Sequence, residues 1–210
     1  MDQIIDFFQY LMNSEEIIQT GGLIAIVLIV YIENGLFFGF FLPGDYLLFL
    51  SGVFAGLGLL KVTLVILLVG VISAAILGAF TGYFSGRLFG ERITIKKDNL
   101  FFKQEYLTKT QKYFERYGPR TLVIARFLPI IRTFAPILAG LVKMNFLQFT
   151  LYNFIGAFLW AFILVGGGFY LGVHFPGIID YVYLVIIFFL VITTFTVVKG
   201  YFNARKEIEN

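Results

Sequence analysis

The sequence predicts an all-α integral membrane protein, and three observations support this prediction. Of its 210 residues, 59% are hydrophobic and 14% are charged, whereas about 25% are charged in an ordinary soluble domain. Apolar runs long enough to cross a bilayer, about 20 residues, recur along the chain. Two of the apolar stretches contain prolines, glycines and charges together, so we expect helices that are broken within the membrane.

Composition argues against several kinds of site. The chain has no cysteine and a single histidine, His174, which we expect in an outer turn, so neither a disulfide nor a metal site is expected. An intramembrane protease needs a nucleophile and base, or two aspartates. Ser51 lacks a glycine two places before it, and Asp45 is preceded by Leu-Pro-Gly and not by Gly-X-Gly. We therefore expect that the protein is not an enzyme and that it binds no metal and no cofactor.

The first half of the chain predicts three elements in order. Residues 1–19 are acidic with apolar residues at helical spacing, which indicates a short helix in the membrane interface; the start of a globular cap is the alternative. Residues 21–60 are apolar but broken at Glu33-Asn34-Gly35 and Pro43-Gly44-Asp45, so they form two crossings or a re-entrant hairpin of shorter arms. Residues 62–86 are a transmembrane helix that completes a first repeat, 21–86.

The second half follows a basic surface segment. Residues 87–120 hold nine lysines and arginines against four acids, which marks the cytoplasmic side and favours anionic lipid heads over nucleic acid. Residues 121–142 are a second broken stretch, and 146–172 are a span that completes the second repeat, 121–172. A further transmembrane helix covers 181–198. All of these elements belong to one membrane domain, 1–210.

The distribution of positive charge predicts the orientation. If residues 121–142 are re-entrant, the basic segment and the C-terminal tail with Arg205 and Lys206 both lie inside, as the positive-inside rule requires. A full crossing would put that tail outside. We therefore expect a re-entrant second hairpin, a cytoplasmic C-terminus and an N-terminus on the outer side.

A weak internal repeat relates the two broken stretches. Phe41-Leu42-Pro43 recurs as Phe127-Leu128-Pro129, and each copy is followed at similar distances by a small-residue pair, a lysine and a span. The predicted orientation makes the two copies inverted. Inverted repeats with broken helices are typical of transporters that bind substrate between the repeats; chance similarity between Phe- and Gly-rich stretches is the alternative.

The ordered set of motifs resembles the DedA family of bacterial membrane proteins, which shares a membrane domain with eukaryotic lipid scramblases. The resemblance spans roughly residues 30–172. It is carried by Glu33, Phe41-Leu42-Pro43-Gly44-Asp45, Gly82-Tyr83, Gly86-Arg87, Arg126-Phe127-Leu128-Pro129-Ile130-Ile131-Arg132, Pro136, Ala139-Gly140, Met144, Asn153 and Gly156-Ala157. It implies a bacterial inner-membrane flippase that returns undecaprenyl phosphate to the inner leaflet, or moves phosphatidylethanolamine, using the proton gradient. It also implies that Glu33, Asp45, Arg126 and Arg132 are essential.

Arg126 and Arg132 are the candidate phosphate-binding residues. Arginine stays charged and its planar fork matches phosphate oxygens. The two are six residues apart and would diverge on an unbroken helix, but Pro129 between them allows a bend that brings both to one anion. Pro43, Gly44, Pro129, Pro136 and Gly140 are expected to supply the backbone breaks around this site.

Glu33 and Asp45 are the candidate proton-coupling residues. An apolar environment favours a neutral carboxyl group and a nearby arginine favours the ionised form, so these acids could take up a proton when an anion displaces them from the arginines. Two structural alternatives remain: the acids only pair with the arginines, or Asp45 caps the following helix. Trp160 is expected to face lipid or to pack, and Asn153 to find a partner within the bundle.

The expected partners are a lipid phosphate, protons and the membrane, and no nucleic acid. The sequence leaves homo-oligomerisation and the identity of the lipid open. Two other functions fit part of the pattern. A proton-coupled cation or drug antiporter would use Glu33 and Asp45 but not the arginines, and a membrane-organising protein would need no charged site at all.

Overall fold

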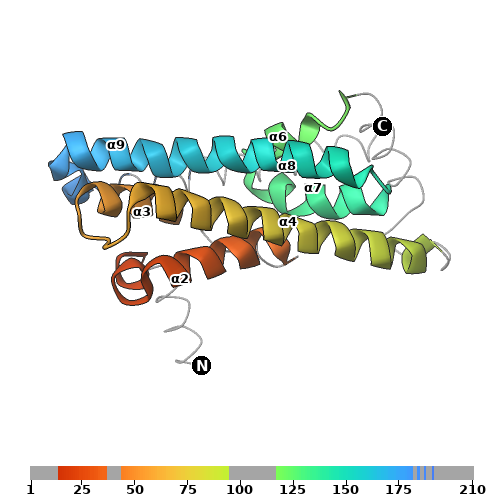
Figure 1. Cartoon of the computed structure of the whole chain (residues 1–210), viewed down its shortest axis with the longest axis horizontal. Helices are drawn as coiled ribbons and strands as arrows, with labels where there is room; N and C mark the ends of the chain where they lie inside the picture. Colours follow the sequence, from red (N-terminus) through yellow and green to blue (C-terminus); the bar gives the residue numbers. More distant parts are fainter. Residues whose placement is uncertain are drawn as a thin grey trace.

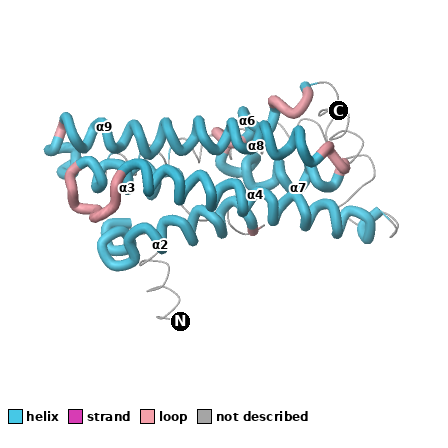
Figure 2. The backbone as a smooth tube through the Cα atoms, in the orientation of Figure 1, coloured by secondary structure: helices cyan, strands magenta, loops and turns pink. Residues whose placement is uncertain are grey.

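The computed structural model describes residues 14–36, 44–94 and 117–181, with single positions at Leu184, Ile187 and Val191. Every regular element in these ranges is helical and none is a strand (Figure 2), which confirms the predicted all-α class. Several predicted features lie outside the described residues: most of the interfacial helix, Pro43, most of the basic segment, and all but four positions of the last helix and its tail.

Two long apolar helices run side by side through the molecule (Figure 1). The first is α4, Leu64–Thr94. The second is continuous from Phe146 to His174 and consists of α8 (Phe146–Ala161), a π-helical turn η2 (Phe162–Gly166) and α9 (Gly167–His174). Segments of 25 and 29 residues in these helices are long and apolar enough to cross a membrane. Both predicted spans are therefore confirmed as long apolar helices, although α4 continues into the segment we expected to lie outside the membrane.

Helix α2, Ser14–Gly35, lies along α4 on the opposite side from α8 (Figure 1). Two helical segments meet at Gly22, whose φ 51° and ψ −143° are a backbone conformation that glycine adopts without the strain of a Cβ. The predicted boundary near residue 20 is therefore present as this kink, and the described residues before it are helical, as expected for a short first helix. Its place in the membrane interface stays a prediction.

Three shorter α-helices and a 3₁₀ helix, η3 (Pro176–Tyr181), complete the described fold. Helix α3, Gly44–Gly56, lies near one end of the long pair, and α6 (Thr121–Ala125) and α7 (Pro129–Leu141) lie toward the other (Figure 1). Helices α3 and α7 have 13 residues each, about 20 Å at 1.5 Å per residue. That length is well short of the hydrocarbon core, which is about 30 Å thick.

The predicted break at Pro129 is present, but two others are wrong. Leu128 is extended and α7 begins at Pro129, as expected for the residue that precedes a proline. Pro136 and Gly140 both lie inside α7. Proline removes only one backbone donor, and here α7 continues past it while the Pro136 ring packs toward Gly82 of α4.

Glycines let each short helix pack closely on the long helix of the other half of the chain. A Cβ on Gly56 of α3 would collide with the carbonyl oxygen of Phe169 in α9, and one on Gly140 of α7 would collide with that of Tyr83 in α4. Close backbone approach at small residues is typical of helix contacts in membranes. Gly56 and Gly140 are the glycines of the two small-residue pairs that the predicted repeat matches with each other.

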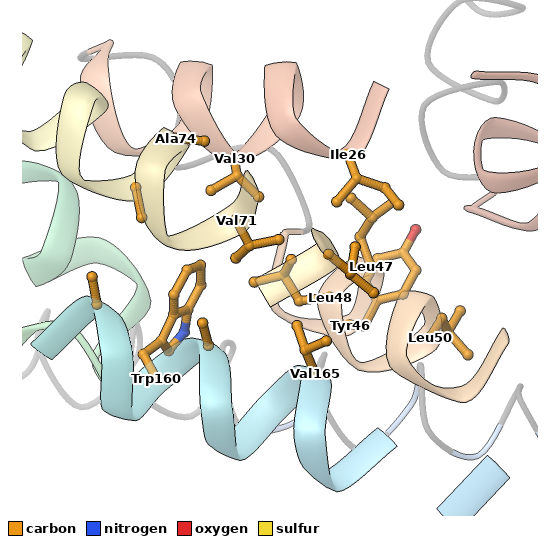
Figure 3. Close-up of a cluster of buried hydrophobic side chains, with 14 of the residues drawn as sticks. Ile26, Val30, Tyr46, Leu47, Leu48, Leu50, Val71, Ala74, Trp160 and Val165 are labelled. Atoms are coloured by element: carbon orange, nitrogen blue, oxygen red, sulfur yellow. The ribbon is translucent and has the colours of Figure 1, made fainter. Parts of the chain in front are cut away.

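Two clusters of buried apolar side chains surround these contacts. The larger joins α2, α3, α4 and the helix that carries Trp160 (Figure 3). The smaller centres on Tyr83 and Phe149, whose rings stack with centroids 4.5 Å apart. Trp160 belongs to the first cluster and Phe149 to the second, and both lie on α8. The polar side chains of the candidate site are enclosed between these two clusters.

Candidate functional site

The break between α6 and α7 places both arginines inside the bundle. Arg126 directly follows the last residue of α6, and Arg132 lies in the first turn of α7. Their side chains are almost fully buried, with 4% and 5% of the residue surface exposed. Charged groups at such depth are costly unless they are paired or bind a ligand, so the partners of each arginine determine what it does.

Arg132 is held by two carboxylates. Its Nη2 donates to Oε1 of Glu33 at the end of α2, and its Nη1 donates to Oδ1 of Asp45 in the first turn of α3. The expected meeting of the two broken stretches is therefore confirmed at this residue. The charge of Arg132 is fully compensated by these two partners.

The two acids differ in their surroundings. Glu33 is 1% exposed, and a Cβ on Gly44 would collide with its Oε2, so the carboxylate needs a glycine at this position. The hydroxyl of Thr133 donates to the backbone oxygen of Glu33 over 3.4 Å. The side chain of Asp45 is 20% exposed. One acid is thus sealed within the bundle and the other reaches its boundary.

Arg126 has a different partner. Its Nη2 donates to Oδ1 of Asn153 on α8, and within the described ranges it forms no ion pair with a carboxylate. The expected bundle partner of Asn153 is therefore this arginine. A neutral amide satisfies one hydrogen bond but leaves the positive charge uncompensated, which is an unusual condition for a buried guanidinium.

Trp160 lies close to both arginines. Our expectation that it packs is confirmed, because it belongs to the larger buried cluster, and the alternative that it faces lipid is wrong. It is 2% exposed and points into the bundle (Figure 3). Its Nε1–H donates to Oδ1 of Asp45 over 3.0 Å, and its ring centroid is 5.0 Å from Cζ of Arg132 and 5.9 Å from Cζ of Arg126. These distances allow cation–π attraction to both charges. Trp160 follows Asn153 by seven residues, so the two lie on one face of the helix. This spacing is the feature of the sequence that could have predicted the place of Trp160 in the site.

A small cavity lies beside the arginines. It measures about 10 Å³ and is lined by Arg126, Arg132, Asn153 and the apolar residues Leu122, Ala135, Pro136 and Phe149. Arg126 Nη1, Arg132 Nε and Asn153 Nδ2 are buried without a hydrogen-bond partner in the described part of the chain. A cavity of this size accommodates about one water molecule, so a larger anion could bind these donors only after the site opens.

Other candidates from the sequence do not join this site. His174 is exposed at the end of α9 and one ring nitrogen lies 2.9 Å from the backbone oxygen of Tyr170. In the residues that the structure describes, no group of His, Cys, Asp and Glu side chains could hold a metal ion. The site thus consists of two arginines, two acids, an amide and an indole, an arrangement suited to holding an anion.

Comparisons with known proteins agree with the sequence resemblance. Residues 42–170 match the family model of the VTT domain. The chain is 37% identical to protein DedA of Escherichia coli K12 over 173 residues, which is 80% of this chain and 79% of that protein. It is 37% identical to the membrane protein Rv0364 of Mycobacterium tuberculosis H37Rv over 78% of this chain and 71% of that protein.

A further relative is the inner membrane protein YqjA of Escherichia coli K12, 36% identical over 72% of this chain and 69% of that protein. No solved structure matches the chain. The domain match covers more than half of the sequence, and each of these relatives matches over more than two thirds of its length. The chain therefore belongs to the DedA family of membrane proteins that carry a VTT domain.

Proposed function

We propose that this protein is a transporter, not an enzyme, and that it moves lipids with a phosphate headgroup across the cytoplasmic membrane. Undecaprenyl phosphate, carried from the outer to the inner leaflet, is the leading substrate. One observation carries the proposal: a buried arginine whose charge no carboxylate compensates within the described residues lies next to a second arginine that two carboxylates hold.

The uncompensated charge supports anion binding. A phosphate group that crosses hydrocarbon must keep polar partners, because an isolated ion in a medium of low dielectric constant costs many kcal/mol. Arg126 offers a permanent positive charge and a free Nη1 donor. The same charge repels cations, so it gives a cation antiporter no advantage. This contrast favours a lipid phosphate over the antiporter alternative.

The short helices support a re-entrant architecture. Helices α3 and α7 are each too short to cross a hydrocarbon core, and each packs on the long helix of the opposite half of the chain. We propose that both belong to re-entrant hairpins related as inverted repeats, with the C-terminus cytoplasmic and the N-terminus outside. Alternating access would then be a rocking of one repeat against the other around the arginines.

The pairing of Arg132 supports proton coupling. An arriving anion competes with Glu33 and Asp45 for the guanidinium groups, and a displaced carboxylate in an apolar environment favours its protonated form. We propose that the displaced acid takes up a proton from the outer side and releases it inside. Asp45, the more exposed of the two, is the one through which protons would enter.

Transport by reconstituted protein tests the proposal. The full chain is placed in liposomes that contain a fluorescent polyprenyl phosphate, and the fraction in each leaflet is followed with and without a pH gradient. We expect gradient-dependent movement that is lost in Glu33→Gln and Asp45→Asn, and in a parallel assay no exchange of protons for cations. Unchanged transport in both variants would overturn the coupling, and cation exchange without lipid movement would overturn the function.

The same assay separates lipids. Phosphatidylethanolamine carries a phosphodiester and an ammonium group, and among the described residues no carboxylate lines the cavity beside Arg126 to pair with that ammonium. We expect faster movement of the polyprenyl phosphate than of labelled phosphatidylethanolamine. Equal rates for the two lipids would favour a general scramblase.

A further inference from the structure

We infer that Asn153 is a third anion-binding residue, and that its amide holds Arg126 in position for a headgroup without neutralising its charge. The inference rests on the proposed function and extends it to a residue outside the four charged ones. It starts from the orientation of this amide, the donors around the cavity and the absence of a carboxylate at this position.

The hydrogen bond to Arg126 fixes which way the amide points. A guanidinium can only donate, so the atom that faces Nη2 of Arg126 must be the amide oxygen, Oδ1 of Asn153. The amide nitrogen therefore points elsewhere. Asn153 is only 4% exposed and its Nδ2 has no partner within the described residues. A buried donor without a partner costs about 1–3 kcal/mol, a penalty that a ligand could relieve.

The free donors converge on one place. Asn153, Arg126 and Arg132 each have an unpartnered N–H group, and all three residues line the same cavity of about 10 Å³. The other lining residues are Leu122, Ala135, Pro136 and Phe149, and their side chains offer no acceptor. A group with several acceptor oxygens and no donors, such as an ionised phosphate, is the chemical complement of this lining.

An amide at this position differs from a carboxylate in two respects, because it is neutral and because it carries N–H donors. Aspartate would have nearly the same shape but would form an ion pair with Arg126, as Glu33 and Asp45 do with Arg132. The anion would then have to displace a charged competitor. Asn153→Asp is therefore expected to stabilise the fold and to weaken anion binding at the same time.

Trp160 supplies the readout, because it is the only tryptophan in the chain and lies within 6 Å of both guanidinium groups. The full chain in a non-ionic detergent is titrated with dodecyl phosphate, with dodecanol as the uncharged control, while tryptophan emission is recorded. We expect a saturable change with the phosphate alone. In Asn153→Asp the dissociation constant should rise at least tenfold and the melting temperature should rise.

Two further variants keep the test decisive. Asn153→Ala adds no charge and removes one donor, and it should raise the dissociation constant about tenfold even if the aspartate variant fails to fold. Thr150→Val alters the same helix one turn earlier, at a residue that does not line the cavity, and should leave binding unchanged. Wild-type affinity in both Asn153 variants would overturn the inference while leaving the proposed function intact. Equal responses of the wild-type protein to dodecyl phosphate and dodecanol would count against both.

Discussion

Arg132 and Arg126 lie in the same polar site, but their surroundings differ. Arg132 is held by carboxylates from two other helices, α2 and α3, and so joins three segments that are distant in the sequence. Arg126 has a single neutral partner on α8. A guanidinium whose charge is compensated by carboxylates contributes to assembly, whereas one whose charge is not compensated is available to an anionic ligand. The difference separates a structural role from a binding role within one site.

Replacing Arg132 should have the largest effect on stability. Arg132→Gln leaves the buried Glu33 and the partly exposed Asp45 without their cation, and breaking a buried pair from one side costs about 3–5 kcal/mol. Unfolding in detergent, followed by circular dichroism, should show this loss in the free energy of unfolding. Arg126→Gln, which orphans no carboxylate, is the matched control and should lose less than about 1 kcal/mol. Equal losses in the two variants would remove the distinction between the arginines.

For ligand binding we expect the opposite order, with a larger loss of affinity in Arg126→Gln than in Arg132→Gln. Arg126→Gln removes a charged hydrogen-bond donor, which is worth about 1.5–3 kcal/mol, so the affinity for dodecyl phosphate should fall about tenfold to a hundredfold. Fluorescence titration measures this change, and the variant should remain folded. If Arg126→Gln binds the phosphate as well as the wild-type protein does, Arg126 is not the binding residue.

The two acids should also rank in a definite order. Glu33→Gln replaces a fully buried partner of Arg132, whereas Asp45→Asn replaces one whose side chain is 20% exposed. We expect a loss of about 2 kcal/mol for Glu33→Gln and about 1 kcal/mol for Asp45→Asn, because the exposed pair is screened by water. Chemical unfolding of both variants under identical conditions gives the comparison. A larger loss for Asp45→Asn would contradict the ranking of Glu33 as the more stabilising partner of Arg132.

Replacing Trp160 should have a small effect, and that effect should fall on the Arg132 side of the site. Trp160→Phe keeps an aromatic ring between the arginines but removes the N–H that donates to Asp45. We expect a loss of about 1 kcal/mol, measured by circular dichroism because the variant has no tryptophan. In an Asp45→Asn background the same substitution should cost less. Full additivity of the two changes would show that this hydrogen bond does not act on Asp45.

The charged part of the site was predictable from the sequence, because charges stand out in apolar stretches. Glu33, Asp45 and Arg132 were expected to meet, and they do. The role of Trp160 was missed because a tryptophan in a membrane helix is ordinarily a packing or interfacial residue, and composition does not report which face of α8 is buried. The partner of Arg126 could not be chosen either, since an acid and an amide were both available.

The backbone was predictable to a similar degree. Pro129 starts a helix as expected, because the residue before a proline avoids helical geometry. Pro136 and Gly140 were expected to break the chain but lie within α7, where Gly140 allows close contact with Tyr83 of α4. A glycine or proline marks either a break or a close contact, and only tertiary packing decides which.

Contact between Arg126 and a lipid phosphate is the most direct test of this account. Solid-state NMR can measure the dipolar coupling between guanidinium nitrogen-15 and phosphorus-31, with the full chain in galactolipid bilayers whose only phosphorus is in an added polyprenyl phosphate. We expect a coupling that corresponds to a hydrogen-bonded pair, with nitrogen and oxygen about 2.8 Å apart, and its loss in Arg126→Gln. The same coupling in that variant, or none in the wild-type protein, would contradict the claim that Arg126 receives the headgroup.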